Sequence, residues 1–183
     1  MKKKHAAIFL DRDGTINEEV SYLDSLEKLV IFPWSFEAVR LINASGMKAV
    51  VISNQSGVAR GYFGEEFVRA VHDKMQQEMN RHGARIDAFY FCPHHPEGLG
   101  VYKQNCTCRK PGTGMLLQAS KMHDIDLVRS FVVGDMLKDV EAGRRAGARG
   151  VLVRTGCGKD VLTNEADFIA ENLLDAVNWI LKL

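Results

Sequence analysis

Short, continuous apolar runs alternate with helical patterns along this chain, and that alternation restricts the possible folds more than any other feature. Continuous apolar strands are typical of parallel sheets, because both faces of such a sheet are buried under helices. The sequence therefore predicts an α/β fold with a doubly wound, mostly parallel sheet. We expect strands at 6–10, 47–52, 86–91, 130–133 and 150–153, and helices at about 35–46, 65–81, 113–122, 137–147 and 171–183.

The ends of the expected helices carry recognisable residues. Ser35 and Thr113 stand where N-caps are expected, because a hydroxyl can accept a hydrogen bond from a free N–H group of the first turn. Gly46 and Gly83 stand where helices should end, because glycine readily adopts the left-handed conformation of a C-terminal cap. No repeat, low-complexity tract or linker divides the chain, so we expect a single domain over residues 1–183.

The charges of the chain nearly balance, with a formal net charge of +1. A protein that binds nucleic acid or a membrane surface needs a basic face, so this balance argues against both classes. A small anionic substrate remains compatible, because a pocket can be locally positive on a neutral protein. The apolar run at 6–10 ends at Asp11 and is too short for a signal peptide or a membrane span. We expect a cytoplasmic protein, and a monomer.

Polar side chains follow the expected strands at the points where the strands end. The carboxyl ends of parallel strands meet at one edge of a sheet, and ligands bind there near a switch in strand order. We therefore expect one set of neighbouring side chains, formed by Asp11, Asp13, Ser53, Asn54, Lys110 and Asp135.

Asp11 and Asp13 lie two residues apart in the stretch FLDRDGTI. On an extended segment such side chains point to the same side, while Arg12 between them points away. Two carboxylates this close favour a bound divalent cation, or else one of them takes up a proton. The alternative interpretation is an ordinary Asp-Gly turn at a strand end, with Gly14 in the turn.

This stretch resembles the nucleophile motif DxDGT of the haloacid dehalogenase superfamily of phosphohydrolases. Three further motifs of that superfamily have matches at later strand ends, namely Ser53 in VISNQ, Lys110 in CRKP, and Asp135 with Asp139 in GDMLKD. The matches span essentially the whole chain. No inserted cap domain fits between them, so a loop at about 92–108 and the segment after the first motif would form the rim of the site.

The resemblance implies a Mg²⁺-dependent phosphatase that works through an aspartyl-phosphate intermediate. Asp11 would be the nucleophile, and Asp13 the general acid and base. Ser53 and Lys110 would stabilise the phosphoryl group as charge spreads over its oxygens. The carboxylates of Asp11 and Asp135 and the main-chain carbonyl of Asp13 would hold Mg²⁺.

Asp139 would orient Lys110 or the water shell of the metal from outside the coordination sphere.

Two other classes of protein are alternatives to an enzyme. A receiver-like module also places acidic residues, a hydroxyl and a lysine on a doubly wound sheet, but a signalling aspartyl phosphate gains nothing from an acid/base such as Asp13. A zinc-dependent interaction protein would leave Asp11 and Asp135 unexplained.

Three of the four cysteines cluster between residues 92 and 108. The donors that we expect to bind Zn²⁺ are Cys92, His94, Cys106 and Cys108. Three thiolates and one imidazole suit a closed tetrahedral site, which is structural rather than catalytic. His95 is a spare ligand that could replace His94.

Other interpretations of the cysteines are a disulfide, a chance cluster, and a reactive thiol. A disulfide framework would spread the cysteines, and one between Cys106 and Cys108 would be strained. Arg109 and Lys110 would lower the pKa of a free neighbouring thiol and make it reactive. Cys157 lies far from the cluster in sequence, and we expect a buried or idle thiol there.

A zinc-pinned loop before an Arg-Lys pair resembles one group of the superfamily, which contains heptose bisphosphate phosphatases and histidinol-phosphate phosphatases. The long interval between the two zinc-binding arms is similar to that of the heptose enzymes. The resemblance thus implies removal of the 7-phosphate of D-glycero-D-manno-heptose 1,7-bisphosphate, in the supply of nucleotide-heptose for cell-surface polysaccharide. Histidinol phosphate or another small phosphomonoester is the alternative substrate.

The same resemblance implies a set of substrate contacts. Arg109 would pair with the phosphate that is not cleaved, because a guanidinium fork matches phosphate oxygens. One position departs from the group, since Met136 stands where well-known members have a lysine that contacts substrate. The implied contacts are Glu19, Val20, Ser21, Tyr22, Asn54, Gln55, Ser56 and Arg109.

Overall fold

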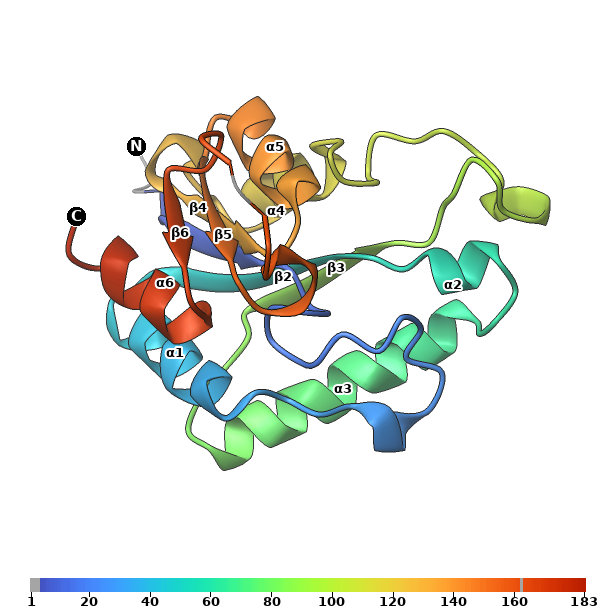
Figure 1. Cartoon of the computed structure of the whole chain (residues 1–183), viewed down its shortest axis with the longest axis horizontal. Coiled ribbons are helices and arrows are strands. Elements are labelled where there is room, and N and C mark those ends of the chain that lie inside the picture. The colour runs from blue at the N-terminus through green and yellow to red at the C-terminus, as the bar shows by residue number, and fades with distance from the viewer. Residues whose placement is uncertain (1–3, 162) are drawn as a thin grey trace.

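The structure is a computed structural model that describes residues 4–161 and 163–183. Within these residues, six strands form one sheet in the order β3-β2-β1-β4-β5-β6, and each neighbouring pair is parallel (Figure 1). The predicted doubly wound α/β fold is therefore confirmed. The strands are β1 (Ala7–Leu10), β2 (Lys48–Asn54), β3 (Ala88–Cys92), β4 (Phe131–Gly134), β5 (Arg149–Val153) and β6 (Phe168–Ala170).

Helices cover both faces of the sheet (Figure 1). One face carries α1, α3 and α6, and the other carries α4 and α5. Among the described residues, no helix combines the length and the apolar character needed to cross a membrane. The helices are α1 (Pro33–Ala44), α2 (Ser56–Ala59), α3 (Glu65–Arg81), α4 (Gly114–Met122), α5 (Leu137–Ala146) and α6 (Leu173–Ile180).

The short strand β1 contributes to both halves of the core. Ile8 and Leu10 pack beneath α1, α3 and α6, whereas Ala7 and Phe9 pack beneath α4 and α5. All four side chains are fully buried. Side chains alternate between the two faces of a strand, so a run of apolar residues fills both cores at once. Burial of one side chain of the size of leucine or phenylalanine stabilises the fold by about 2 kcal/mol.

The helix ends agree only in part with the predictions. The N-cap of α1 is Phe32, with Pro33 at the first helical position, so the prediction that Ser35 caps this helix is wrong. The Ser35 hydroxyl instead donates to the carbonyl of Ile16 at 2.9 Å, which ties α1 to the segment after β1. Thr113 is the N-cap residue of α4, but its side chain makes no capping hydrogen bond.

Glycines end two helices as expected. Gly46 follows α1 with φ +79°, and Gly83 follows α3 with φ +69°, so both adopt the left-handed conformation that residues with a Cβ avoid.

The strand order determines where a ligand can bind. From β1 the chain proceeds to β2 and β3 on one side, and the later strands β4, β5 and β6 lie on the other side. The switch in direction is therefore between β1 and β4, and it opens a crevice at their carboxyl ends. The loop that joins β3 to α4 extends beyond this edge, next to α2, on the right of Figure 1.

Candidate active site

A cavity of about 340 Å³ lies at the carboxyl ends of β1, β2 and β4. Most residues expected at the site line it, but Val20 does not, and Asp139 is buried beneath it. The expected residues in the lining are Asp11, Asp13, Glu19, Ser21, Tyr22, Ser53, Asn54, Gln55, Ser56, Arg109, Lys110 and Asp135. The structure thus brings the strand-end side chains together, as their positions in the sequence indicate.

Lys110 is buried between two carboxylates. Its Nζ donates to Asp11 Oδ1 at 2.7 Å and forms an ion pair with Asp139 Oδ1 at 2.7 Å. A third contact, at 2.8 Å, reaches the carbonyl of Ile52. Burial alone would lower the pKa of Lys110, but Asp11 and Asp139 raise it above its usual value. A fixed positive charge therefore lies directly beside Asp11.

Three buried carboxylates meet at the end of β1 and β4. Asp11, Asp135 and Asp139 each offer an oxygen within 4.8 Å of the others. Burial, opposed by the charge of Lys110, raises the pKa of Asp11 to about 7, and the two neighbouring carboxylates contribute to this rise. Burial also raises the pKa of Asp135. A divalent cation relieves such crowding, and carboxylate oxygens are ligands that Mg²⁺ prefers, so Asp11 and Asp135 fit a Mg²⁺ site.

Two glycines allow Asp135 to lie close to the main chain. Gly14 (φ +78°) and Gly156 (φ +55°) both pack against the Asp135 carboxylate, and a Cβ at either position would collide with it. The main-chain N–H of Cys157 donates to Asp135 Oδ2 at 2.7 Å. The Thr155 hydroxyl donates to the carbonyl of Gly14 at 2.5 Å. The segment after β5 therefore fixes the position of Asp135.

Asp13 turns onto Arg12, so the prediction that Arg12 points away is wrong. Arg12 donates from Nε to Asp13 Oδ1 at 3.0 Å and from Nη2 to Oδ2 at 2.8 Å. Asn17 donates to Oδ1 at 3.0 Å, and Gln55 to Oδ2 at 2.9 Å. The chain turns at Gly14, so the alternation of an extended strand no longer applies, and the buried guanidinium finds its counter-ion next to it.

These four donors determine the charge of Asp13. Burial would raise the pKa of Asp13, but the charge of Arg12 and the bonds from Arg12, Asn17 and Gln55 outweigh it. The pKa is consequently below its ordinary value, and Asp13 rests as a carboxylate. This group must exchange some of these partners before it can donate a proton to another atom.

Two side chains at the end of β2 hold functional neighbours in place. Gln55 Nε2 donates to Ser53 Oγ at 2.6 Å, so it bridges Ser53 and Asp13. Asn54 makes a reciprocal pair with the main chain of Lys110, accepting from its N–H at 2.9 Å and donating to its carbonyl at 3.1 Å. Both Asn54 and Gln55 therefore have partners within the protein in addition to their place in the cavity wall.

The rim of the cavity comes from the segment after β1 and from the end of the β3–α4 loop. Ser21 adopts a left-handed conformation (φ +59°), and Tyr22 packs edge-on against Tyr62 with 4.7 Å between ring centroids. Partial desolvation, together with the charge of Asp13, raises the pKa of Glu19. Arg109 donates from Nη1 to the carbonyl of His94 at 3.3 Å.

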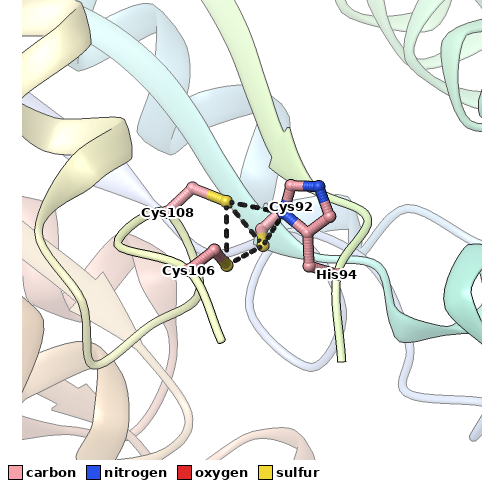
Figure 2. Close-up of side chains that lie close together, drawn as sticks. All are labelled: Cys92, His94, Cys106 and Cys108. Carbon is pink, nitrogen blue, oxygen red and sulfur yellow. Dashed lines mark hydrogen bonds between the residues drawn. The ribbon is translucent and has the colours of Figure 1, made fainter. Parts of the chain in front are cut away.

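The cysteine cluster forms a second, separate donor set (Figure 2). The side chains of Cys92, His94, Cys106 and Cys108 converge, and one donor atom of each lies within 4.8 Å of all the others. Cys108 Sγ lies 2.8 Å from Cys92 Sγ, 3.2 Å from Cys106 Sγ and 3.3 Å from His94 Nδ1. These contacts are no longer than the roughly 3.8 Å edge of a tetrahedron with Zn–S bonds of about 2.3 Å.

The chemistry of these donors fits Zn²⁺ better than the alternatives. All four cysteines are free, so no disulfide forms. Burial and hydrogen bonds from neighbouring thiols raise the pKa of Cys92, and burial raises that of Cys108. Burial would raise the pKa of Cys106, but hydrogen bonds from Cys108, Cys92 and the main chain together outweigh it and lower the pKa. His95 takes no part, because its Nδ1 accepts from the N–H of Glu97 at 3.1 Å.

Sequence reasoning missed three contributors to the site. Arg12 is buried against Asp13, and a bulky cation between two acids in a buried segment was a signal for this pairing. Lys138 lines the cavity from the first turn of α5, the helix that follows Asp135. The N–H of Cys157 follows another strand end, at β5, and the thiol of this residue is exposed, so the expectation of a buried thiol is wrong.

Known proteins resemble this chain over most of its length. The family model described as HAD-hydrolase-like matches residues 107–176. A curated relative from Thermosynechococcus vestitus, named D-glycero-D-manno-heptose-1,7-bisphosphate 7-phosphatase, is 45% identical over 95% of this chain and 94% of its own length. A relative from Haemophilus influenzae, named D-glycero-beta-D-manno-heptose-1,7-bisphosphate 7-phosphatase, is 41% identical over 93% of this chain and 92% of its own.

A solved structure extends the likeness to the fold. The D,D-heptose 1,7-bisphosphate phosphatase from B. bronchiseptica, complexed with magnesium and phosphate, has a TM-score of 0.86 and 32% sequence identity to this chain. The match covers 97% of this chain and 98% of that one.

Proposed function

This chain belongs to the haloacid dehalogenase-like hydrolases, and we propose that it removes the 7-phosphate of D-glycero-D-manno-heptose 1,7-bisphosphate. Curated relatives with 38% to 49% identity carry the name of that activity. The observation that carries the chemistry is the buried group of Asp11, Lys110 and Asp135 at the strand switch, which opens into the cavity. Such an enzyme supplies a heptose phosphate for nucleotide-heptose and cell-surface polysaccharide.

In the first step, Asp11 attacks the phosphorus. A bond forms between the Asp11 carboxylate and phosphorus, and the bond between phosphorus and the sugar oxygen breaks. Lys110, 2.7 Å from Asp11, lies where it can bind an oxygen of the group in transfer, and the Ser53 hydroxyl approaches from β2. Asp13, after it has taken up a proton from solvent and exchanged some of its partners, donates that proton to the leaving alkoxide.

In the second step, Asp13 acts as the base. It takes a proton from water, the water oxygen attacks phosphorus, and Asp11 is released with inorganic phosphate. The lowered pKa of Asp13 suits this step, because the carboxylate form persists to low pH. Gln55 positions Asp13 and Ser53 relative to each other, since its amide donates to both.

Mg²⁺ is the catalytic cofactor, and Zn²⁺ is the structural one. The carboxylates of Asp11 and Asp135 and the carbonyl of Asp13 would hold Mg²⁺, which neutralises negative charge at the phosphoryl group when bound. Asp139 is a positioning residue that orients Lys110 through their ion pair. Cys92, His94, Cys106 and Cys108 would hold Zn²⁺ and order the loop that delivers Arg109 and Lys110.

We further propose that the chain is a single-domain monomer that acts in the cytoplasm. One sheet with a core on each face supports a single domain over residues 1–183, of which 1–3 and 162 lie outside the described residues. Four free cysteines support a reducing compartment.

A phosphate-release assay tests the reaction and the substrate together. Both anomers of heptose 1,7-bisphosphate, histidinol phosphate and fructose 1,6-bisphosphate are compared in the presence of Mg²⁺. We expect the heptose bisphosphate to have the highest kcat/KM, and Asp11→Asn to release no phosphate. Turnover of histidinol phosphate alone would assign the chain to the alternative substrate, and equal turnover by Asp11→Asn would remove the nucleophile assignment.

A further inference from the structure

Among the described residues, four cations line the cavity, and two of them already have carboxylate partners. They are Arg12, Arg109, Lys110 and Lys138. Arg12 is bound by both oxygens of Asp13, and Lys110 is held between Asp11 and Asp139. Arg109 and Lys138 remain, because neither forms an ion pair with a carboxylate in the described part of the chain.

Lys138 has the position of a ligand-binding cation rather than of a solvated surface lysine. It lies in the first turn of α5, three residues after Asp135, and is half-buried in the cavity wall. No side-chain hydrogen bond or ion pair within residues 4–161 and 163–183 occupies its ammonium group. Its charge opposes the rise in pKa of Glu19, so Lys138 lies near the rim segment after β1.

The substrate needs a second cationic site. A sugar bisphosphate carries one phosphate into the group formed by Asp11 and Lys110, and the other phosphate must lie elsewhere in the cavity. A phosphate monoester binds best where cations have no competing carboxylate partner. Met136, the neighbouring side chain of the cavity wall on the same segment, has no charge to offer.

Building on the proposed function, we propose that Lys138 binds the phosphate that is not cleaved, opposite Arg109, and so selects bisphosphates over monophosphates. Arg109 belongs to the end of the zinc-binding loop, and Lys138 belongs to α5, so two separate elements would hold this phosphate. The long and flexible lysine side chain reaches toward it as a point charge, while the guanidinium of Arg109 offers a fork.

Lys138→Gln tests this role on two substrates. For heptose 1,7-bisphosphate we expect KM to rise roughly 10-fold, because a hydrogen bond between charged groups is lost. The kcat value should stay within about twofold, because the phosphate is held equally in the ground state and the transition state. For p-nitrophenyl phosphate, which has no second phosphate, kcat/KM should not change.

Three further variants make the test specific. Lys121→Gln removes the same charge from an exposed position on α4 and should leave both substrates unaffected. Lys138→Arg should retain most of the affinity for the bisphosphate. Met136→Lys in the Lys138→Gln background should restore affinity, because it returns a cation to the same wall of the cavity. A purely structural role of Lys138 would not be rescued in this way.

The outcomes separate this proposal from the one it rests on. An unchanged KM for the bisphosphate in Lys138→Gln, or an equal loss on both substrates, would overturn the role of Lys138 while leaving the phosphatase intact. If the wild-type protein releases no phosphate from the bisphosphate but hydrolyses p-nitrophenyl phosphate, the proposed substrate is wrong, and this role of Lys138 falls with it.

Discussion

The carboxylate of Asp13 accepts four hydrogen bonds, one for each of its lone pairs. Two donors come from Arg12, one from Asn17 and one from Gln55. They fix the carboxylate beside the nucleophile and keep its pKa below the ordinary value in spite of burial. The arrangement suits the second step of the reaction, in which the Asp13 carboxylate takes a proton from water.

Replacing Arg12 with methionine removes the charge that holds this pKa down. In Arg12→Met we expect the pKa of Asp13 to rise, because burial is then opposed only by neutral donors. The acidic limb of the profile of kcat/KM against pH should move to higher pH. Arg12→Lys, which keeps the charge but loses the fork, should shift the limb less. If the acidic limb of the pH profile is the same in wild type and Arg12→Met, the ionisation of Asp13 does not produce that limb.

His72 makes the fold sensitive to acid. It is buried in α3, stacks on Phe89 with 4.7 Å between ring centroids, and its Nε2 has no hydrogen-bond partner among the described residues. Burial, followed by the charge of Arg12, lowers the pKa of His72 to about 3. The unfolded chain takes up a proton near pH 6.5, so stability is present above that pH and falls as pH drops toward 3.

His72→Leu should therefore reduce the acid sensitivity. Between pH 7 and pH 5 the wild type should lose about 2 kcal/mol more free energy of unfolding than the variant. Urea unfolding at the two pH values measures the difference. Parallel losses in both proteins would mean that His72 is solvated or charged in the folded state.

Among the elements, the zinc-binding loop has the least regular structure and the closest link to function. The chain leaves β3 at Cys92, passes through the loop, and returns with Cys108 directly before Arg109 and Lys110. The position of the Lys110 ammonium group depends on the course of the loop, because the side chain of Asn54 on β2 forms two hydrogen bonds with the main chain of Lys110. The metal-binding donors thus act on catalysis through the position of one lysine.

Cys108→Ser should uncouple the loop from the sheet. We expect loss of bound zinc, faster proteolysis within 93–107, and roughly 100-fold lower phosphate release, because a displacement of about 1 Å at Lys110 has this effect. Cys157→Ser is the control for zinc binding and proteolysis, since it removes a thiol outside the cluster and should change neither. Alkylating reagents should react slowly with the cluster in zinc-replete protein. Rapid alkylation of Cys106 in that protein would contradict the zinc assignment.

Long elements and strand-end residues could be predicted from the sequence, and short ones could not. The bounds of α3 match the expected 65–81, because many residues there share one helical period. The four residues of α2 and the three of β6 are too few to show any period. β6 exists because the edge of β5 offers it hydrogen bonds, and that edge is a product of the whole fold.

The same distinction applies to the candidate site. Asp11, Ser53 and Asp135 could be placed together because parallel strands end at one edge. The pairing of Arg12 with Asp13 could not, because it depends on the turn at Gly14. The strand order, which puts β4 beside β1, likewise arises from packing over the whole chain and not from any local pattern.

The carboxylates at the strand switch are needed for catalysis, but their burial together lowers the stability of the whole fold. Two of the helix-covered strands end in carboxylates that are buried together, and burial raises the pKa of both Asp11 and Asp135. In metal-free protein, Asp11 ionises near pH 7 when folded but near pH 4 when unfolded. Because the folded-state pKa is raised, stability is lost as pH rises from about 4 to 7.

Mg²⁺ should reverse this loss, and Asp135→Asn should remove the need for it. The variant keeps the shape of the side chain but removes one of three carboxylates that lie within 4.8 Å of one another. We expect its metal-free Tm at pH 7.5 to exceed that of wild type by about 3 °C, which corresponds to about 1 kcal/mol in a chain of this size. Its Tm should respond little to Mg²⁺, and phosphate release should be abolished.

In wild type, the increase in Tm caused by Mg²⁺ should be larger at pH 7.5 than at pH 5, because protonated carboxyl groups bind the cation poorly. Differential scanning calorimetry with Mg²⁺ and with EDTA measures both proteins, and Asp73→Asn, which replaces an exposed carboxylate of α3 outside the cavity, is the control for net charge. A metal-free Tm of Asp135→Asn below that of wild type would show that the carboxylate stabilises the fold, for example through its bond from the N–H of Cys157, more than repulsion destabilises it.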